Sequence, residues 1–337
     1  MKKLILILLF ALAFKAEAQN FPQAAVYPVQ TVRRAATGAT SHFYVGSYLG
    51  DGNDNRNISI VWADGGSYTP DVLIIKDSVA NQSVMRLSNM TGDTTCYPAS
   101  ATAFQQNQIQ SLGANTFQVG TDATVNTLNH RYYVMVWAAN GTKDLVVGKY
   151  TGNGSDNRWI EVGVVPKLAI VRGNGALGGR WKTASYTGDN TMNFATGSGL
   201  TGIIKALGGL GGGGTGDSIE VGTSANSNTN GTVYYYAIFN TITNYAWEGT
   251  YNGTGVTQSI VATTATPDMV WIGGNNTFER IFSITLMGNL AAQWTAAANQ
   301  INNGVQAFLS NGFTVYGFSG NTDANAVTYY YFCAKAH

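Results

Sequence analysis

The sequence predicts an all-β protein made of three tandem β-sandwich, jelly-roll-like domains. Three observations predict this fold class: abundant strand and turn formers, few charged residues, and a pattern that occurs three times. Glycine accounts for 41 of the 337 residues and tyrosine for 18, whereas only 11% of the residues are charged. Tyrosine, valine and isoleucine favour strands, and glycine favours the turns that connect them.

Each repeat begins with a glycine-rich turn that leads into an alternating strand. The three copies of this turn are GSYLGDGNDNRNISI (46–60), GKYTGNGSDNRWIEV (148–162) and GTYNGTGVTQSI (249–260). Trp159 and Glu161 alternate with Ile160 and Val162, which places the two pairs on opposite faces of a strand. We therefore expect a strand, a turn and a second strand at the start of every repeat.

Two further strands follow each turn in the same order. A proline precedes an apolar strand in PDVLIIK (70–76), PKLAIVR (166–172) and PDMVWIG (267–273). An aromatic strand closes the repeat in RYYVMVWA (131–138), VYYYAIFN (233–240) and TYYYFCAK (328–335). Residues 168–171 form a short apolar run, so we expect the strand LAIVR (168–172) to be covered on both faces. Short strands separated by turns indicate sandwiches, and units of about 95–100 residues suit such domains.

These repeats predict three domains, at residues 41–141, 142–243 and 244–337. The linkers between them are short, so the domains are expected to have few relative orientations. In the third domain, the Ala-rich stretch 289–301 predicts a short helix with Asn289 as its cap.

Residues 1–18 have the features of a secretory signal peptide. A positively charged start precedes an apolar run from Leu4 to Phe14 and the exit sequence Ala16-Glu17-Ala18. We expect cleavage after Ala18, an extracellular mature protein, and an extended arm over residues 19–40 that either pairs with a neighbouring chain or is disordered. The run is shorter than the roughly 20 apolar residues that span a bilayer, so no membrane span is expected.

The charge distribution excludes nucleic acid as an expected partner. The formal net charge is +1, and the only basic cluster is Arg33-Arg34. Binding to phosphate backbones requires clustered lysine and arginine residues. The chain has no such cluster of useful size.

The glycine-rich turn admits two interpretations. As a calcium loop, the first copy offers oxygen ligands from Asp51, Asn53, Asp54 and Asn55. Arg56 stands where a calcium loop has glycine, and the third copy lacks the carboxylates. We therefore expect no cofactor, with calcium at the first turn as the alternative.

As a structural turn, the stretch uses glycine for backbone freedom and arginine for anchoring. Its structural residues are Gly50, Gly52, Arg56, Gly152, Gly154 and Arg158. The two arginines are expected to point inward, because a guanidinium can donate to several loop carbonyls at once. This interpretation is favoured because the third copy keeps the glycines and loses the charged residues.

Catalytic residues are not evident, and we expect no enzyme. The three histidines, His42, His130 and His337, do not recur between repeats and are expected at the surface. Cys96 and Cys333 are far apart in sequence. An exported location permits a disulfide, but Cys333 aligns with Val136 and Ile238, which favours a buried free thiol.

The aromatic residues provide candidates for a binding surface. Trp62, Trp181 and Trp294 fall in or beside variable stretches, where exposed rings could stack on sugars. Trp137, Trp159 and Trp271 fall in shared strands and are expected in the core. A host-surface glycan is therefore a candidate partner.

The order of the motifs resembles a tandem module of phage tail-fibre and other virion proteins. The matching segments are Val147 to Ile160, Pro267 to Ile272, Gly312 to Gly317 and Tyr329 to Ala336. The resemblance implies a β-sandwich module with a structural or receptor-binding role and without catalytic residues. A predicted signal peptide is not typical of virion proteins, so a secreted bacterial surface protein stays an alternative.

Two classes of function follow. The first is a structural or adhesive protein of a virion or cell-surface appendage that self-associates into a homo-oligomer or filament, because weakly charged edge strands are natural pairing sites. The second is a secreted bacterial carbohydrate-binding protein that uses the loop aromatics.

Overall fold

The structure is a computed structural model that describes residues 41–337 apart from 80, 140, 142–143, 198, 210–215, 296–303 and 318. Antiparallel sheets dominate it, which confirms the all-β prediction. The described helices are α1 (Ala123–Asn126) and the 3-10 turn η1 (Thr285–Met287). The predicted signal peptide (1–18) and arm (19–40) lie outside the described residues. In the part of the chain that the structure describes, no helix is long and apolar enough to cross a membrane.

The strands fall into three sets, which we call repeats 1, 2 and 3. Repeat 1 contains β1 (His42–Leu49), β2 (Arg56–Ser59), β3 (Val72–Asp77), β4 (Val84–Leu87), β5 (Ile109–Gly113), β6 (Thr116–Val119) and β7 (Arg131–Ala138). Repeat 2 contains β8 (Leu145–Thr151), β9 (Arg158–Glu161), β10 (Leu168–Gly173), β11 (Arg180–Thr183), β12 (Met192–Asn193), β13 (Ile204–Leu207), β14 (Ser218–Val221) and β15 (Val233–Phe239). Repeat 3 contains β16 (Ala246–Asn252), β17 (Gln258–Val261), β18 (Met269–Gly274), β19 (Ile281–Ile284), β20 (Ala292–Gln293), β21 (Val305–Leu309), β22 (Gly312–Val315) and β23 (Thr328–Ala334).

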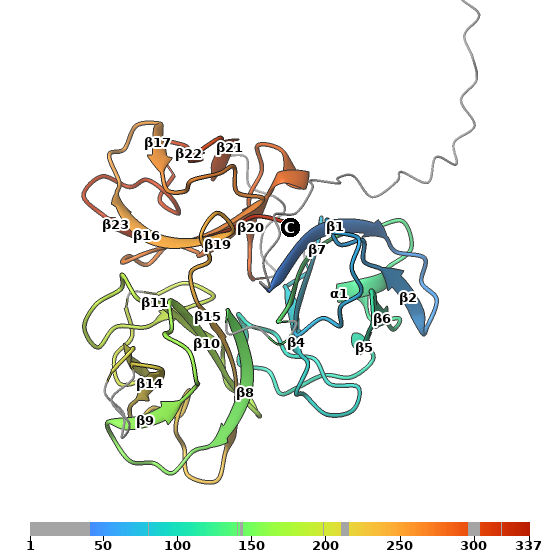
Figure 1. Cartoon of the computed structure of the whole chain (residues 1–337), viewed down its shortest axis with the longest axis horizontal. Helices are drawn as coiled ribbons and strands as arrows, with labels where there is room; N and C mark the ends of the chain where they lie inside the picture. The colour runs from blue at the N-terminus through green and yellow to red at the C-terminus, as the bar shows by residue number, and fades with distance from the viewer. Residues whose placement is uncertain are drawn as a thin grey trace, which may run out of the picture. The chain divides into compact units, whose positions relative to one another are not determined.

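Every repeat forms a larger and a smaller antiparallel sheet with the same strand connections (Figure 1). Starting from the first strand of each repeat, the larger sheets have the orders β1-β7-β3-β4, β8-β15-β10-β11-β12 and β16-β23-β18-β19-β20. The smaller sheets, listed in the same direction, have the orders β2-β6-β5, β9-β14-β13 and β17-β22-β21. In repeat 1, a bridge between Met85 and Cys96 takes the place of the fifth strand. The first and last strands of a repeat are therefore always neighbours, which makes the closing aromatic strand central to its sheet.

The central strands of each larger sheet are buried on both faces. One face packs on the smaller sheet of its own repeat and forms a separate apolar core. The other face contributes to one core that all three repeats share. Strands β3, β10 and β18 are consequently buried at every position, as expected for 168–172 from its apolar run.

Aromatic rings connect the repeats within the shared core. The ring centroid of Trp137 lies 5.8 Å from that of Trp271 and 5.4 Å from that of Phe239, and Phe239 lies 5.5 Å from Phe332. The described residues belong to one compact unit. The division into three independent domains at 41–141, 142–243 and 244–337 therefore stays a prediction.

The expected helix over 289–301 is wrong in its described part. Ala292 and Gln293 form strand β20, which pairs with β19. Trp294 is fully buried beside it. The rest of the predicted helix lies largely outside the described residues. Packing of this segment against the shared core overrides its helix propensity.

Candidate functional site

The second glycine of the glycine-rich turn has the same backbone conformation in all three repeats. Gly52, Gly154 and Gly255 have positive φ angles of 74°, 72° and 73°. Two residues earlier, an added Cβ atom would lie 2.0–2.1 Å from a carbonyl oxygen at Gly50, Gly152 and Gly253. A side chain would be strained at the first set of positions and would collide with backbone at the second.

The arginine of the first two turns anchors the preceding strand. Arg56 donates through Nη1 to the Leu49 carbonyl at 2.5 Å and to Oδ1 of Asn126 at 3.2 Å. Arg158 makes the same contacts with the Thr151 carbonyl at 2.6 Å and Oδ1 of Asn228 at 3.3 Å. Both guanidinium groups also lie 5.5 Å from a tyrosine ring centroid. These are the inward contacts that the structural interpretation expects.

The third turn preserves this network with different residues. Gln258 donates through Nε2 to the Asn252 carbonyl at 2.9 Å and to Oδ1 of Asp323 at 2.5 Å. The same Asp323 oxygen accepts the Thr254 N–H at 2.9 Å, as Asn228 accepts the N–H of Asn153. A glutamine–aspartate pair thus replaces an arginine–asparagine pair.

The two carboxylates among the candidate calcium ligands, Asp51 and Asp54, accept hydrogen bonds from the turn and from nearby donors. Asp51 accepts the Asn53 N–H at 2.9 Å and lies 3.3 Å from Nε of Arg56. Asp54 accepts the backbone and side-chain N–H groups of Asn55 at 2.9 and 3.0 Å. Within the described residues, no group of three or more His, Cys, Asp or Glu side chains is placed to hold a metal ion. Oxygens of this turn are engaged in the turn itself.

The expected exposure of three tryptophans is wrong. Trp62, Trp181 and Trp294 are only 2%, 1% and 1% exposed. Trp62 belongs to the core of repeat 1, and the other two belong to the shared core. Neighbouring loops look variable in sequence because they cover different core surfaces. Buried rings cannot stack on a sugar, so this candidate carbohydrate surface loses its residues.

Two histidines were also expected at the surface, and that expectation is wrong. His42 and His337 are 6% and 4% exposed, and their ring centroids lie 5.8 Å apart. His337 belongs to repeat 3, and its backbone N–H donates to the Phe43 carbonyl of repeat 1 at 3.2 Å. Because the histidines do not recur, comparison of the repeats gave no signal for this contact.

The histidine pair is part of a cluster of polar aromatic residues. His42 stacks on Tyr68 at 3.7 Å between centroids and lies 3.7 Å from the Asp64 carboxylate. The Tyr68 hydroxyl donates to Asp64 at 2.6 Å. On the other side, His337 stacks on Tyr245 at 3.9 Å. We call these five residues the histidine cluster.

Burial determines the charge states of this cluster. It lowers the pKa values of His42 and His337, against the raising effect of the nearby Asp64 carboxylate. Burial alone would raise the pKa of Asp64, but hydrogen bonds from Tyr68 and Gly66 and the proximity of His42 lower it overall. Neutral imidazoles beside a carboxylate are therefore favoured.

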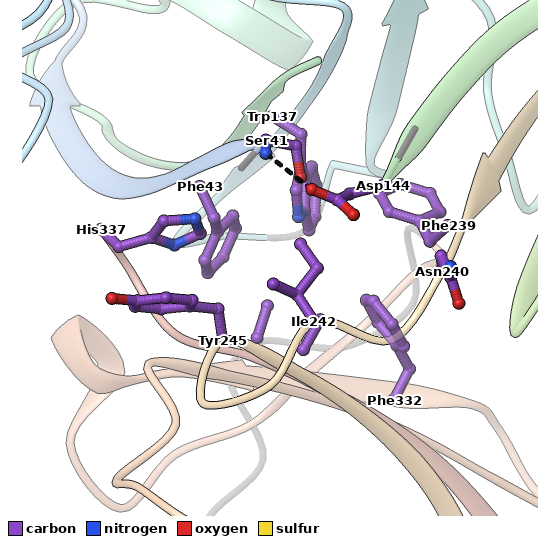
Figure 2. Close-up of a pocket in the computed structure, with 12 residues that line it drawn as sticks. Ser41, Phe43, Trp137, Asp144, Phe239, Asn240, Ile242, Tyr245, Phe332 and His337 are labelled. Atoms are coloured by element: carbon purple, nitrogen blue, oxygen red, sulfur yellow. Dashed lines mark hydrogen bonds between the residues drawn. The ribbon is translucent and has the colours of Figure 1, made fainter. Parts of the chain in front are cut away.

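A small pocket adjoins the histidine cluster where the chain passes between repeats (Figure 2). Figure 2 shows the ring of His337 beside those of Phe43 and Tyr245, with Asp144 across the pocket. The Asp144 carboxylate accepts the Ser41 N–H at 3.2 Å. The enclosed space accommodates about one water molecule. It is too small for a substrate of metabolite size.

The proline–aspartate pairs of the sequence have a structural role. Asp71 accepts the Ala139 N–H at 2.8 Å just past the closing strand β7. Asp268 accepts the Ala336 N–H at 3.0 Å at the same place in repeat 3. Lys167 stands at this position in repeat 2. The recurrence of aspartate after proline in two of the three repeats was the sequence signal for this hydrogen bond at the end of the closing strand.

Cys96 and Cys333 are buried free thiols. Burial raises the pKa of Cys96 to about 11 and raises the pKa of Cys333 well above its ordinary value. Neither thiol has the accessible, thiolate-favouring surroundings of a reactive cysteine.

Comparisons with known proteins give no family. No protein-family model matches the chain, and no curated protein matches it significantly.

Proposed function

We propose that the chain is a non-enzymatic structural or adhesive protein of a virion, of the tail-fibre or decoration type, or of a cell-surface appendage. The observation that carries the proposal is the use of the polar residues that recur between repeats. Arg56, Arg158 and Gln258 all donate to a carbonyl of their own repeat. The polar residues that recur between the repeats therefore stabilise the fold. If the repeats carried reaction sites, we would expect catalytic side chains to recur instead.

The shared core supports a mechanical role. Large aromatic side chains from all three repeats pack together in it, including Trp137, Phe239 and Trp271. Burial of such rings contributes more than most side chains to the free energy of unfolding. A body held together in this way presents its loops in fixed positions, which suits attachment to a partner or a host surface.

The histidine cluster supports the non-enzymatic part of the proposal. A general base must reach the proton that it removes, within about 2.6–3.2 Å. His42 and His337 are buried against Tyr68 and Tyr245. The adjoining pocket accommodates only about one water molecule. This arrangement suits packing between repeats better than turnover of a substrate.

Immunogold electron microscopy tests the proposal. Antibodies against residues 41–337 would be applied to producing cells and to any particles they release, with an unrelated exported protein as the labelling control. Label on virions or appendages is the expected result. Label confined to the cytoplasm, or turnover of a polysaccharide by the purified protein, would overturn the proposal. Glycan recognition through Trp62, Trp181 and Trp294 is not part of it.

A further inference from the structure

The contact between repeats 1 and 2 is built on backbone carbonyls of repeat 1. The Gly179 N–H, just before β11, donates to the Pro98 carbonyl at 2.8 Å. The fully buried Arg172 donates to the carbonyls of Tyr97 and Thr102 at 3.4 and 2.5 Å. A guanidinium buried in this way needs several acceptors at once, and loop 97–102 supplies two of them.

The contact between repeats 2 and 3 has the same plan. Arg280, also buried, donates to the Gly197 carbonyl of repeat 2. The Ser185 N–H donates to Glu248 at 3.1 Å, and Tyr186 packs on Tyr330 at 4.2 Å between centroids. In both contacts a cation of the later repeat binds a loop carbonyl of the earlier one.

The contact between repeats 3 and 1 completes the series. The Ser83 N–H, just before β4, donates to the Trp294 carbonyl at 3.0 Å, which matches the bond from Gly179 to Pro98. The indole N–H of Trp271 points to the sulfur of Met135 at 3.4 Å. Repeat 3 therefore offers repeat 1 the same backbone acceptor that repeat 1 offers repeat 2, although Lys76, which aligns with Arg172, donates within its own repeat. We call this third contact the closing junction.

The closing junction differs from the others in connectivity. Chain segments join repeat 1 to repeat 2 and repeat 2 to repeat 3, but none joins repeat 3 to repeat 1. The histidine cluster stands in that place: His337 bonds to Phe43 and lies against His42. Separation of repeats 3 and 1 thus breaks no covalent bond, and each exposed surface is complementary to the other.

We propose that the closing junction is an exchangeable interface, at which repeat 3 of one chain closes onto repeat 1 of a second copy, and that protonation of His42 and His337 promotes the exchange. Two complementary, non-identical surfaces on one molecule can be satisfied within the chain or between chains. Exchange recreates the same contacts, so its main barrier is opening the junction. This inference deepens the self-association that the proposed function includes and does not depend on the adhesive role.

The surroundings of the histidines explain the expected effect of acid. Asp64 and Tyr68 face His42, whereas Tyr245, His42 and the carbonyl of Lys335 face His337. Asp144 also lines the pocket beside His337. Asp64 can compensate one imidazolium, but a second positive ring would lie 5.8 Å from the first. The backbone groups of Lys335 and Ser41 favour a charged His337, but burial outweighs them and keeps its pKa below the ordinary value.

The sign of the pH effect follows from the lowered pKa values. In the closed state both histidines have pKa values below the ordinary 6.5. An opened junction exposes them to water and restores the ordinary value. The open state then binds more protons below about pH 6.5, so acid weakens the closing junction and higher pH restores it.

Tag exchange after an acid pulse tests the proposal. Two copies of the full chain with different affinity tags would be mixed, held near pH 5 and returned to near pH 7.5, the range in which histidine titrates. Pull-down through one tag should recover severalfold more of the other copy than without the pulse, because acid populates the open junction. Light scattering after chromatography should show dimers, and circular dichroism should show unchanged secondary structure.

Variants separate the histidine effect from general acid unfolding. His337→Phe keeps a ring against Tyr245 but cannot be protonated, and His42→Gln is a second variant in case the first folds poorly. Both should lose the acid-induced exchange, whereas the control His130→Phe, at a histidine outside the junction, should keep it. No exchange in the wild type at any pH, or undiminished exchange in both variants, would overturn the proposal. Immunogold labelling of appendages would be unaffected by that outcome.

Discussion

The glycine-rich turns of repeats 1 and 2 differ from that of repeat 3 in charge but not in hydrogen bonding. In repeat 2, Asn228 accepts from Asn153 and Arg158 and donates to the Ser155 carbonyl at 2.6 Å. In repeat 3, Oδ1 of Asp323 also accepts two hydrogen bonds, but a carboxylate cannot donate. Thr254 supplies the missing donor, since its hydroxyl lies 3.0 Å from the Val256 carbonyl.

This difference shows what the turn requires. In repeat 3, Gln258 replaces the arginine, Asp323 replaces the asparagine, and Thr254 replaces the residue after the first glycine. Together these three substitutions keep the hydrogen-bond donors and acceptors of the turn occupied. A buried polar group without a partner costs about 1–3 kcal/mol, whereas changing the sign of a partly exposed charge costs less. The hydrogen-bond pattern is therefore constrained in all repeats, and the net charge of the turn is free to vary.

The largest effect is expected at the first glycine of the turn, which is Gly50, Gly152 or Gly253 in the three repeats. In Gly152→Ala, the new Cβ would lie 2.1 Å from the Thr229 carbonyl oxygen. We expect a loss of about 3 kcal/mol or more in the free energy of unfolding, because backbone must move. Gly163→Ala is the control: φ is 77° but the space is open, so strain of about 1–2 kcal/mol is expected. Equal losses in chemical denaturation would contradict the collision argument.

A smaller effect is expected from the buried amide of repeat 2. Asn228→Ala leaves the Asn153 N–H, the Ser155 carbonyl and Arg158 without their partner, at a cost of about 2–3 kcal/mol. Asn230→Ala, at an exposed position two residues later, should cost less than about 0.5 kcal/mol. Thermal and urea unfolding measure both. If Asn228→Ala is as mild as the control, hydrogen bonding is not what the repeats preserve.

Strand pairing aligns Arg86, Lys182 and Ser283 in the three repeats, which permits a pH test. Burial lowers the pKa of Lys182 from 10.5 to about 8. Between these values the unfolded chain binds more protons than the folded one, so stability should rise with pH by at most about 1.4 kcal/mol per unit. Lys182→Ser, the residue of repeat 3, should remove this rise. Unfolding by urea at pH values from about 7 to 10.5 measures the slope; an identical slope in the variant would refute the assignment.

The smallest effect is expected where repeat 3 has cysteine in place of an aliphatic residue. Cys333 and Val136 occupy the same position in the cores of repeats 3 and 1. Cys333→Val should change stability by less than about 1.5 kcal/mol, as a swap of similar volume does. Cys333→Ser buries a hydroxyl in the same place and should cost about 1–3 kcal/mol. A thiol reagent should not react with native protein; rapid labelling would contradict the burial of both thiols.

Much of the fold could be predicted because the repeats preserve what backbone geometry demands. The glycines and the tyrosine of each turn recur, and Tyr48, Tyr150 and Tyr251 each donate to a loop carbonyl at 2.5–2.6 Å. The apolar run at 168–171 indicated burial on both faces, which the shared core supplies. These recurrent features could be recognised from one sequence because the three repeats can be aligned with one another.

The contacts between repeats could not be predicted in the same way. Trp181 and Trp294 of the shared core looked like loop residues, as did Trp62 of the repeat 1 core, because nothing local shows which segments fold back onto a core. His42 and His337 are separated by nearly the whole described chain and occur once each. Their proximity depends on how the ends of repeats 1 and 3 meet, which is information that local periodicity does not contain.

Burial of the central strands of the larger sheets also affects how folding and solubility depend on ionic strength. The charged side chains on the inner strands of those sheets, such as Arg172 and Lys182, are buried away from dissolved ions. Most surface polarity then comes from amides and hydroxyls, which ions do not screen. Folding and solubility of such a body should change little between dilute buffer and seawater-like ionic strength, so the same chain can serve in either medium.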